Sequence, residues 1–237
     1  MTKGDINKKL VAHTHDVLST LANPEKAIEM AAYMKTSMPF YGVQKPDRLP
    51  IIRDLRVNFA PENHDQYVNN VLSLWQQTNR EQKYLAINYA ESFPEFIIID
   101  SLPLYERMVR EGSWWDYTDS IASHLTGPVL LANEAEVRPI IDGYIYDSDF
   151  WIRRTGLLSH LGHKKNTSSK HLFSYCRKLA SEKEFFIRKG IGWALREYSK
   201  SEPAKVKQFL VENKGTLSSL SYNEGAKHLI KTGLMKG

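Results

Sequence analysis

Apolar and polar residues follow helical rather than strand periodicity along most of the chain. In the stretch 185–198, apolar residues recur every three to four positions and predict one buried helix face. The stretch 113–125 predicts a second buried face in the same way. Strand-like alternation is scarce, so the pattern predicts an all-α protein. The two predicted faces consist of Ile187, Ile191, Ala194, Leu195 and Tyr198 in one helix and Trp114, Tyr117, Ile121 and Leu125 in the other.

Proline at four places predicts where helices begin. It suits the first helical turn because its missing N–H would have no partner there. The β-branched run 96–100 follows one of these prolines and is interpreted as a buried helix segment. The four predicted starts are Asn23-Pro24-Glu25, Ala60-Pro61-Glu62, Phe93-Pro94-Glu95 and Glu202-Pro203-Ala204.

A six-residue pattern recurs after 35 positions. Residues 149–154 match residues 184–189 in residue type, and Trp114-Trp115 gives a weaker third copy about 36 residues before Trp151. This period is typical of helical pairs that stack into an α-solenoid with one curved surface open to a partner. No Gly/Ser-rich linker divides the chain, so we expect residues 1–237 to form a single domain.

The composition excludes several classes of protein. Hydrophobic residues make up 42% and charged residues 25% of the 237, which excludes a disordered chain. The single cysteine, Cys176, cannot form an internal disulfide, and the polar N-terminus does not resemble a signal peptide. No apolar stretch is long enough to span a membrane. We therefore expect a cytoplasmic protein without a membrane role.

Positive charge is concentrated in one part of the sequence. The whole chain carries a formal charge of +5, but residues 151–200 hold 12 Lys or Arg against 3 Glu, a net +9. The rest of the chain therefore sums to −4. Such a distribution indicates a surface for a polyanion, most commonly nucleic acid, although solvated helix faces would give the same count.

Three side chains on the predicted helix 185–198 indicate a binding surface. Lys189, Trp193 and Arg196 lie on the helix face opposite its buried stripe. Two cations therefore flank an indole on a face that is predicted to lie outside the core, where large apolar side chains are unusual. Aromatic and Arg side chains on one face are typical of nucleic-acid binding. The alternative is that Trp193 packs against an adjoining repeat.

A carboxylate at the edge of the other predicted stripe is a candidate for chemistry. Trp115 and Asp119 are four residues apart, so they lie one above the other on the helix, whereas Asp116 points further toward solvent. The structural alternatives for Asp119 are a salt bridge to a neighbouring Arg or a capping contact. Arg154 has two open roles as well, as a phosphate ligand or as a partner in a partly buried ion pair.

Cofactor motifs are missing from the sequence. The eight histidines lack metal-ligand spacing, and no Gly-rich phosphate-binding loop is present. The sequence therefore predicts neither a metal nor a nucleotide cofactor.

Four ordered blocks resemble the DNA alkylation repair protein family, the AlkD-like DNA glycosylases built of HEAT-like helical repeats. The resemblance covers nearly the whole chain. The blocks are Asn23–Lys26 with Met30–Lys35, Tyr41–Arg48, Ser113–Ser120 and Lys183–Tyr198.

This resemblance implies an all-α solenoid with a concave basic face that binds duplex DNA. It implies hydrolysis of the N-glycosidic bond of cationic N3- and N7-alkylated purines without base flipping, by a monomer that needs no metal. Its catalytic positions fall on Asp119, Trp115 and Trp193. Gly190, which would interrupt the last helix, and Arg153 and Arg188 depart from the family pattern. The expected DNA-binding residues are Tyr33, Gln44, Arg154, Arg188, Lys189 and Arg196, with Lys164 and Lys165 as possible additions.

The chemistry of the lesion agrees with a single catalytic carboxylate. A purine alkylated at N3 or N7 is already cationic and leaves as a neutral base, so no general acid is needed. Asp119 would stabilise positive charge growing on the deoxyribose and position the attacking water. Two alternatives stay open at this point, a non-catalytic DNA-binding repeat protein and a protein-interaction scaffold.

Overall fold

The computed structural model describes residues 3–236, and these residues form helices and turns with no strand. The all-α prediction is confirmed. The chain divides into two compact units, Met1–Ser101 and Leu102–Gly237. Whether they make up the single domain expected from the sequence stays a prediction. The first unit contains α1 (Lys3–Thr20), α2 (Pro24–Met34), α3 (Lys45–Asn58), α4 (His64–Trp75), α5 (Arg80–Glu91) and the 3₁₀ turns η1 (Pro94–Phe96) and η2 (Ile99–Ser101).

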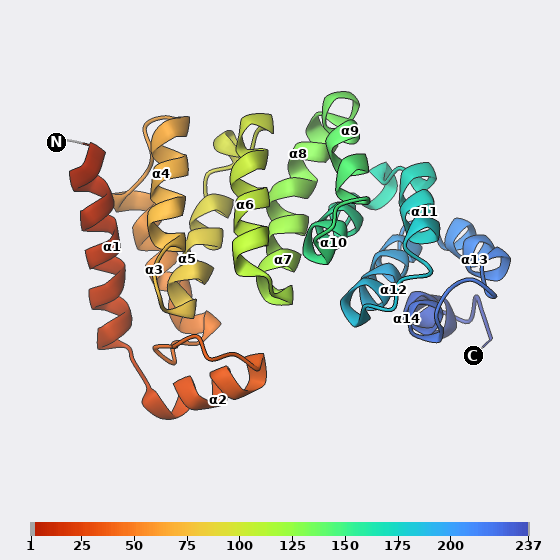
Figure 1. Cartoon of the computed structure of the whole chain (residues 1–237), viewed down its shortest axis with the longest axis horizontal. Helices are drawn as coiled ribbons and strands as arrows, with labels where there is room; N and C mark the ends of the chain where they lie inside the picture. The colour runs from red at the N-terminus through yellow and green to blue at the C-terminus, as the bar shows by residue number, and fades with distance from the viewer. Residues whose placement is uncertain (1–2, 237) are drawn as a thin grey trace. The chain divides into compact units, whose positions relative to one another are not determined.

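The second unit is a succession of helical pairs (Figure 1). In the view of Figure 1, α9, α11 and α13 lie on one side of this unit and α10, α12 and α14 on the other. Its elements are α6 (Leu102–Gly112), α7 (Trp115–Ser120), the π-helical η3 (Ile121–Thr126), α8 (Gly127–Ala132), α9 (Glu134–Tyr144), α10 (Phe150–Leu158), the 3₁₀ turn η4 (Lys164–Asn166), α11 (Ser169–Lys178), α12 (Phe185–Ser199), α13 (Pro203–Glu212) and α14 (Ser219–Lys231).

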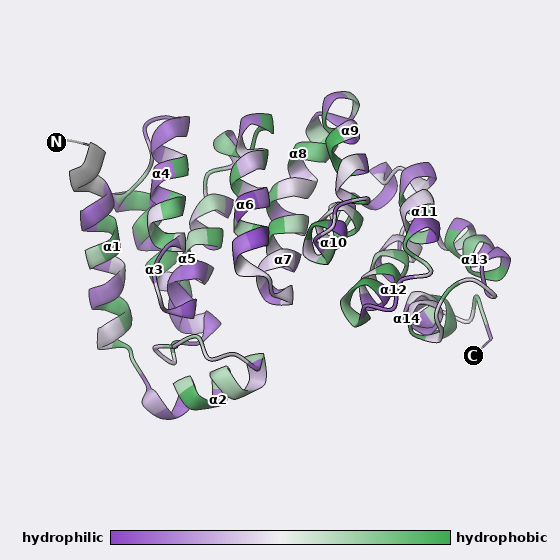
Figure 2. Ribbon diagram, viewed as in Figure 1, coloured by the Kyte–Doolittle hydropathy of each residue, from purple (hydrophilic) through white to green (hydrophobic). Residues whose placement is uncertain are grey.

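The predicted buried stripes lie in the core. All five stripe residues of α12 are buried, and Figure 2 shows hydrophobic and hydrophilic residues interleaved along this helix and its neighbour α14. In the other stripe Tyr117, Ile121 and Leu125 are fully buried, while Trp114 is partly exposed. The sequence periodicity therefore identified the inner faces of both helices.

The 35-residue repeat corresponds to two helix starts with the same construction. Asp149 precedes α10 and Glu184 precedes α12, and each carboxylate accepts a hydrogen bond from the backbone N–H two residues ahead. Such N-caps satisfy donors that the first helical turn leaves free. Aromatic rings near these starts then pack at tilted angles, with Trp151 4.8 Å from its repeat equivalent Phe186 and 6.2 Å from Trp114 between ring centroids. The starts of α7, α10 and α12 are therefore joined by aromatic contacts.

Helix α7 continues into a π-helical segment. The N–H of Gly127, at the end of η3, donates to the carbonyl of Ala122, five residues earlier, instead of the four of an α-helix. His163 Nε2 then contacts the carbonyl oxygen of Gly127 at 2.9 Å. A Cβ on Gly127 would lie 2.7 Å from the backbone oxygen of Ser159, so this position has no room for a side chain.

A buried carboxylate organises the loop between α2 and α3 in the first unit. Glu81 is fully buried and accepts hydrogen bonds from the backbone N–H groups of Tyr41, Gly42 and Val43. Gly42 has a φ of 84°, and a Cβ there would lie 2.0 Å from the backbone oxygen of Asn23. Glycine is required at this turn because both the dihedral angle and the space exclude a side chain.

Two buried histidines, His160 and His163, follow α10 and contact residues of α8, α9 and α11. His160 Nε2 lies 3.1 Å from Arg138 Nη1, and Arg138 also contacts the Tyr175 hydroxyl at 3.3 Å. Burial, the positive charge of Arg138 and the neighbouring His163 lower the pKa of His160 to about 3. Burial likewise lowers the pKa of His163. The ring of His171 also lies near this cluster, 6.4 Å from the Tyr175 ring between centroids.

Acidification is therefore expected to destabilise the protein. Below pH 6.5 the unfolded chain binds a proton at His160, whereas in the folded chain His160 stays neutral down to about pH 3. The free energy of unfolding therefore decreases as the pH drops through this range. The slope contributed by His160 is about 1.4 kcal/mol per pH unit. Denaturant unfolding at a series of pH values measures it, and the variant His160→Leu should have the shallower slope. An equal slope in both proteins would contradict this origin.

Three sequence predictions about helices are wrong. Pro61 does not begin a helix, because α4 starts at His64 and Asn63 is its N-cap, with its side chain bonded to Gln66 N. The run 96–100 forms parts of two 3₁₀ turns on the surface rather than a buried helix. Gly190 does not interrupt α12, which continues unbroken to Ser199. The starts at Pro24 and Pro203 are confirmed.

In the part of the chain that the structure describes, no helix is long and apolar enough to cross a membrane.

Candidate functional site

Asp119 and Arg154 form a buried, two-pronged ion pair between α7 and α10. Arg154 Nε donates to Asp119 Oδ1 at 2.7 Å, and Nη2 donates to Oδ2 at 2.9 Å. The exposed fractions of the two side chains are 4% for Arg154 and 15% for Asp119. This geometry matches the fork of a guanidinium to both carboxylate oxygens and fixes the orientation of Asp119.

The surroundings of Arg154 hold its guanidinium in place. Its remaining terminal nitrogen, Nη1, donates to the backbone oxygen of Phe186 at the start of α12. A Cβ on Gly190 would lie 2.9 Å from that nitrogen, so the glycine leaves the space that the guanidinium occupies. Gly190 thus serves the ion pair. Of the two roles left open for Arg154, the structure has the internal ion pair. The side chain is 4% exposed, and its place among the expected DNA-binding residues stays a prediction.

The pKa of Asp119 is raised above its ordinary value of 3.8. Burial is the main cause, and the hydrogen bonds and charge of Arg154 counter only part of it, while the nearby Asp116 adds to the increase. The ionised form of Asp119 is therefore the costly form, and it becomes available only as the pH rises past this increased value.

The two tryptophans expected beside Asp119 are both partly exposed. Trp115 begins α7, one turn before Asp119 on the same helix. Trp193 lies on α12, one turn beyond the pair Lys189 and Gly190. Partly exposed indoles on α7 and α12 are available to a ligand, in contrast to the fully buried Trp75 of the first unit.

The predicted cations of α12 differ in their partners. Lys189 Nζ lies 3.0 Å and Arg196 Nη1 2.8 Å from one oxygen of Glu224, a residue of α14 that the sequence did not single out. Arg188 makes no ion pair with any residue between 3 and 236, whereas Arg153 is tied to Glu182 and to the backbone oxygen of Asp147. Lys164 and Lys165 are exposed on η4. Arg188 is thus the predicted α12 cation without an anionic partner.

The remaining predicted residues, Tyr33 and Gln44, belong to the first unit. Both line a cavity of about 350 Å³ between α2, α3 and α5, where Arg48 stacks over the Tyr84 ring at 4.6 Å. The Tyr33 ring is 75% exposed. The structure therefore brings these two residues together with each other, and their place in a DNA-binding surface stays a prediction.

One signal in the sequence pointed to Glu224. Positions 119, 154, 189 and 224 are separated by 35 residues each, the period found between α10 and α12. They hold Asp, Arg, Lys and Glu, and the structure pairs the first with the second and the third with the fourth. Extending the repeat by one more period would have predicted Glu224 as the partner of Lys189.

Metal ligands do not gather anywhere in residues 3–236 as a group of three or more His, Cys, Asp or Glu side chains.

Comparisons with known proteins identify the family of this chain. A family model described as DNA alkylation repair enzyme matches residues 14–229. A solved structure described as a predicted DNA alkylation repair enzyme from Enterococcus faecalis has 30% sequence identity and a TM-score of 0.80, over 89% of this chain and 97% of that one. Among curated proteins, no match was found.

Proposed function

The chain belongs to the DNA alkylation repair enzyme family, whose role is repair of alkylated DNA, and from this premise we propose that it is a DNA glycosylase. Its substrates are N3- and N7-alkylated purines in duplex DNA, and it hydrolyses their N-glycosidic bond. The observation that carries this proposal is the buried Asp119 carboxylate, which Arg154 orients. Partly exposed tryptophans lie one turn before it on α7 (Trp115) and on α12 (Trp193).

The lesion determines what the protein has to supply. An N3- or N7-alkylated purine carries a positive charge that it loses on departure, so the base leaves without protonation. The barrier lies in the positive charge that grows on the deoxyribose as the bond breaks. A fixed carboxylate lowers this barrier because its negative charge is present before the reaction begins. Normal purines lack the charge and react poorly at the same site.

Arg154 acts as a positioning residue in this mechanism. Its guanidinium occupies the side of the carboxylate that faces α10, so Asp119 cannot rotate away when DNA binds. Each carboxylate oxygen has a further lone pair for the sugar cation or for the attacking water. Asp119 then orients this water and accepts its proton as the new C–O bond forms.

Trp115 and Trp193 contact the sugar and the cationic base in the proposed complex. The face of an indole is electron-rich and attracts cations, by about 0.5–2 kcal/mol. Their aromatic surfaces also exclude bulk water from the bond that breaks. The lesion stays outside any protein pocket, since the chemistry needs access to the sugar rather than to the edges of the base.

The proposal is tested by the release of free modified base from methylated duplex DNA under single-turnover conditions. Release faster than spontaneous depurination is the expected result. DNA binding without release would instead support a non-catalytic DNA-binding protein, and neither binding nor release would support a protein-interaction scaffold.

The rate of base release is expected to fall in acid at a higher pH than an ordinary aspartate would give. Only ionised Asp119 stabilises the sugar cation, and burial raises the pKa of this carboxyl above 3.8. The rate should therefore rise with pH through that increased pKa and then level off. Single-turnover rates across the acidic range, corrected for spontaneous loss of the base, measure this rise of the rate with pH. A rate independent of pH down to pH 3.8 would contradict the assignment.

A further inference from the structure

Three cations converge on a single buried carboxylate at the contact between α12 and α14. Lys189 and Arg196 come from α12 and lie within 3.0 Å of Glu224 Oε2. Lys227, one turn along α14, donates to the other oxygen, Oε1. These contacts occupy both carboxylate oxygens of Glu224, and its side chain is only 5% exposed.

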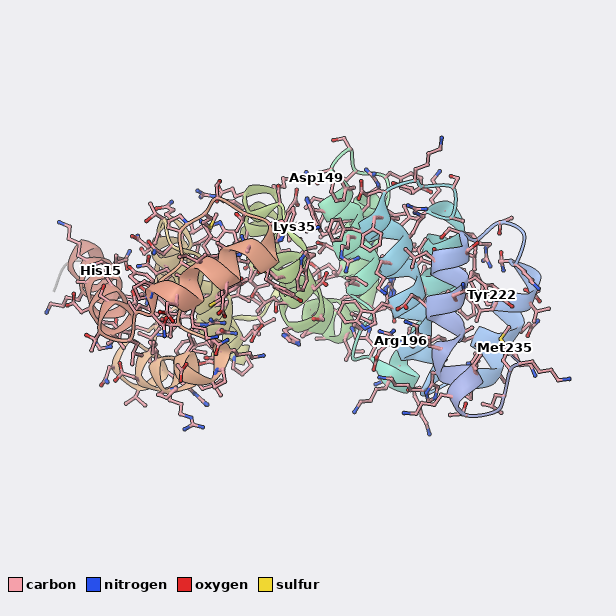
Figure 3. All side chains as sticks on the ribbon, turned by 90° about the horizontal axis from the view of Figure 1, so that it is seen from below. His15, Lys35, Asp149, Arg196, Tyr222 and Met235 are labelled. Carbon is pink, nitrogen blue, oxygen red and sulfur yellow. The ribbon has the colours of Figure 1, made fainter. Side chains whose placement is uncertain are left out.

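Close packing of the two helices builds this arrangement. A Cβ on Gly192 would lie 2.3 Å from Glu224 Cβ, and one on Gly225 would lie 3.2 Å from Leu195 Cβ. The two glycines therefore let α12 and α14 approach closely along their length. Figure 3 shows the helices side by side, with Arg196 labelled on the first and Tyr222 on the second. At this separation Glu224 reaches cations one turn above and one turn below Gly192.

The cluster carries more positive charge than Glu224 can neutralise. Three cations and one carboxylate leave a net charge of +2. The exposed fractions of the side chains are 40% for Lys189, 30% for Arg196 and 56% for Lys227, so the cations face solvent while their common anion does not. Each also has N–H donors beyond the one given to Glu224. The surface is therefore that of an anion site with donors already gathered.

The repeat offers an internal comparison. Arg154 and Lys189 hold equivalent positions 35 residues apart, yet the Arg154 pair with Asp119 is neutral and nearly closed to solvent. The pair of Lys189 with Glu224 has gained two cations and is open on its cationic side. Equivalent repeat positions thus form a neutral ion pair closed to solvent at Arg154 and a positively charged, solvent-facing cluster at Lys189.

We propose that Glu224 is a positioning residue which holds Lys189, Arg196 and Lys227 as a clamp for one phosphate of the DNA backbone. This rests on the proposed function, since it takes DNA as the ligand. It adds Lys227 to the phosphate contacts expected from the sequence and gives Glu224 a role that its negative charge alone would argue against.

The variant Glu224→Gln separates positioning from simple charge. Removing a negative charge from a basic surface strengthens DNA binding if only the net charge matters. If Glu224 gathers the clamp, the three cations repel one another and disperse, and affinity for plain duplex DNA falls roughly tenfold, equal to about 1.4 kcal/mol. Fluorescence anisotropy with an undamaged duplex measures whether the affinity of the variant for DNA is lower or higher than that of the wild type. Equal or tighter binding by a variant that unfolds at the wild-type temperature would overturn the proposal.

A second variant keeps the test independent of the fold of the α12–α14 contact. Lys227→Ala removes one of the three exposed cations and is expected to make the slope of log K against log salt shallower, by at most about 0.9, the value for one whole phosphate contact. Lys207→Ala on α13 removes another exposed charge, outside the cluster, and should leave the slope unchanged. A slope for Lys227→Ala equal to that of Lys207→Ala would contradict the clamp.

These outcomes are distinct from failure of the glycosylase proposal. A wild-type protein that binds no DNA contradicts the function and the clamp together. A wild-type protein that binds DNA and releases base, with both cluster variants unaffected, contradicts the clamp alone.

Discussion

Asp119→Asn is expected to release modified base at least about 10²–10³-fold more slowly than the wild type, the range for loss of one preorganised electrostatic group. Asparagine has nearly the same shape and still accepts a hydrogen bond from Arg154, but it carries no charge to oppose the growing cation on the sugar. Affinity for duplex DNA should change less than twofold, about 0.4 kcal/mol, because the substituted group is 15% exposed and apart from the Glu224 cluster. Single-turnover base release and duplex binding measure the two effects.

A matched control lies on the same helix. Asp116→Asn removes an equal charge three residues away, at a partly exposed position, and leaves the Asp119 carboxylate and its two hydrogen bonds from Arg154 in place. Its rate of base release should stay within a few-fold of the wild-type rate. The rise of this rate with pH should move to lower pH, because Asp116 raises the pKa of Asp119 in the wild type. Comparable loss of activity in both variants, or none in Asp119→Asn, would contradict the catalytic assignment.

Arg154→Met is expected to destabilise the folded protein by about 3–5 kcal/mol at neutral pH, the usual cost of removing one partner from a buried ion pair. Methionine fills much of the space but leaves Asp119 buried without a cation, so the pKa of this carboxyl rises further. The folded state then holds a proton that the unfolded state has lost. Stability relative to the wild type should therefore recover as the pH falls and Asp119 becomes neutral. Denaturant unfolding at neutral and acidic pH measures both effects.

The adjacent arginine supplies the control for this variant. Arg153 pairs with Glu182 at 2.6 Å, but the exposed fractions of these side chains are 18% and 22%, so solvent screens the loss. Arg153→Met should cost about 1 kcal/mol and show little recovery in acid. Adding Asp119→Asn to Arg154→Met should restore part of the lost stability. A double variant as unstable as the sum of its parts would show that the two side chains are not coupled.

Much of the second unit could be predicted from the sequence because residues of the same type recur at the period of its structural repeat. The apolar stripe of α12 and the 35-residue period were both visible in the sequence, and in the structure the period corresponds to equivalent helix starts at Asp149 and Glu184. Arg154 was different. Its position between the apolar and polar sides of a helix left two roles open, and the choice depended on Asp119 lying across the α7–α10 contact.

Other features depended on tertiary contacts that leave no local pattern. Gly190 looks like a helix breaker in the sequence, but its missing side chain makes room for a guanidinium on another helix. The 35-residue period indicates Glu224 as a partner for Lys189, but only the folded chain shows that Arg196 and Lys227 bind the same carboxylate. Glu81 is similar, since its bonds to the backbone of residues 41–43 join segments about 40 residues apart. Charge and periodicity locate surfaces and cores, whereas such partners are found only in the folded chain.

The π-helical segment η3 limits how the length of this chain can vary among relatives. Upstream, α7 is fixed by the ion pair of Asp119 with Arg154, and downstream the helix is fixed by the contact of Gly127 with His163. One residue gained or lost in an α-helix turns everything beyond it by about 100°. A wide turn is the place where an extra residue is absorbed, so a one-residue gap between relatives belongs in 121–126. The same gap inside the regular α-helical turns of α7 or α8 would turn the Asp119 carboxylate relative to Arg154, or Gly127 relative to His163.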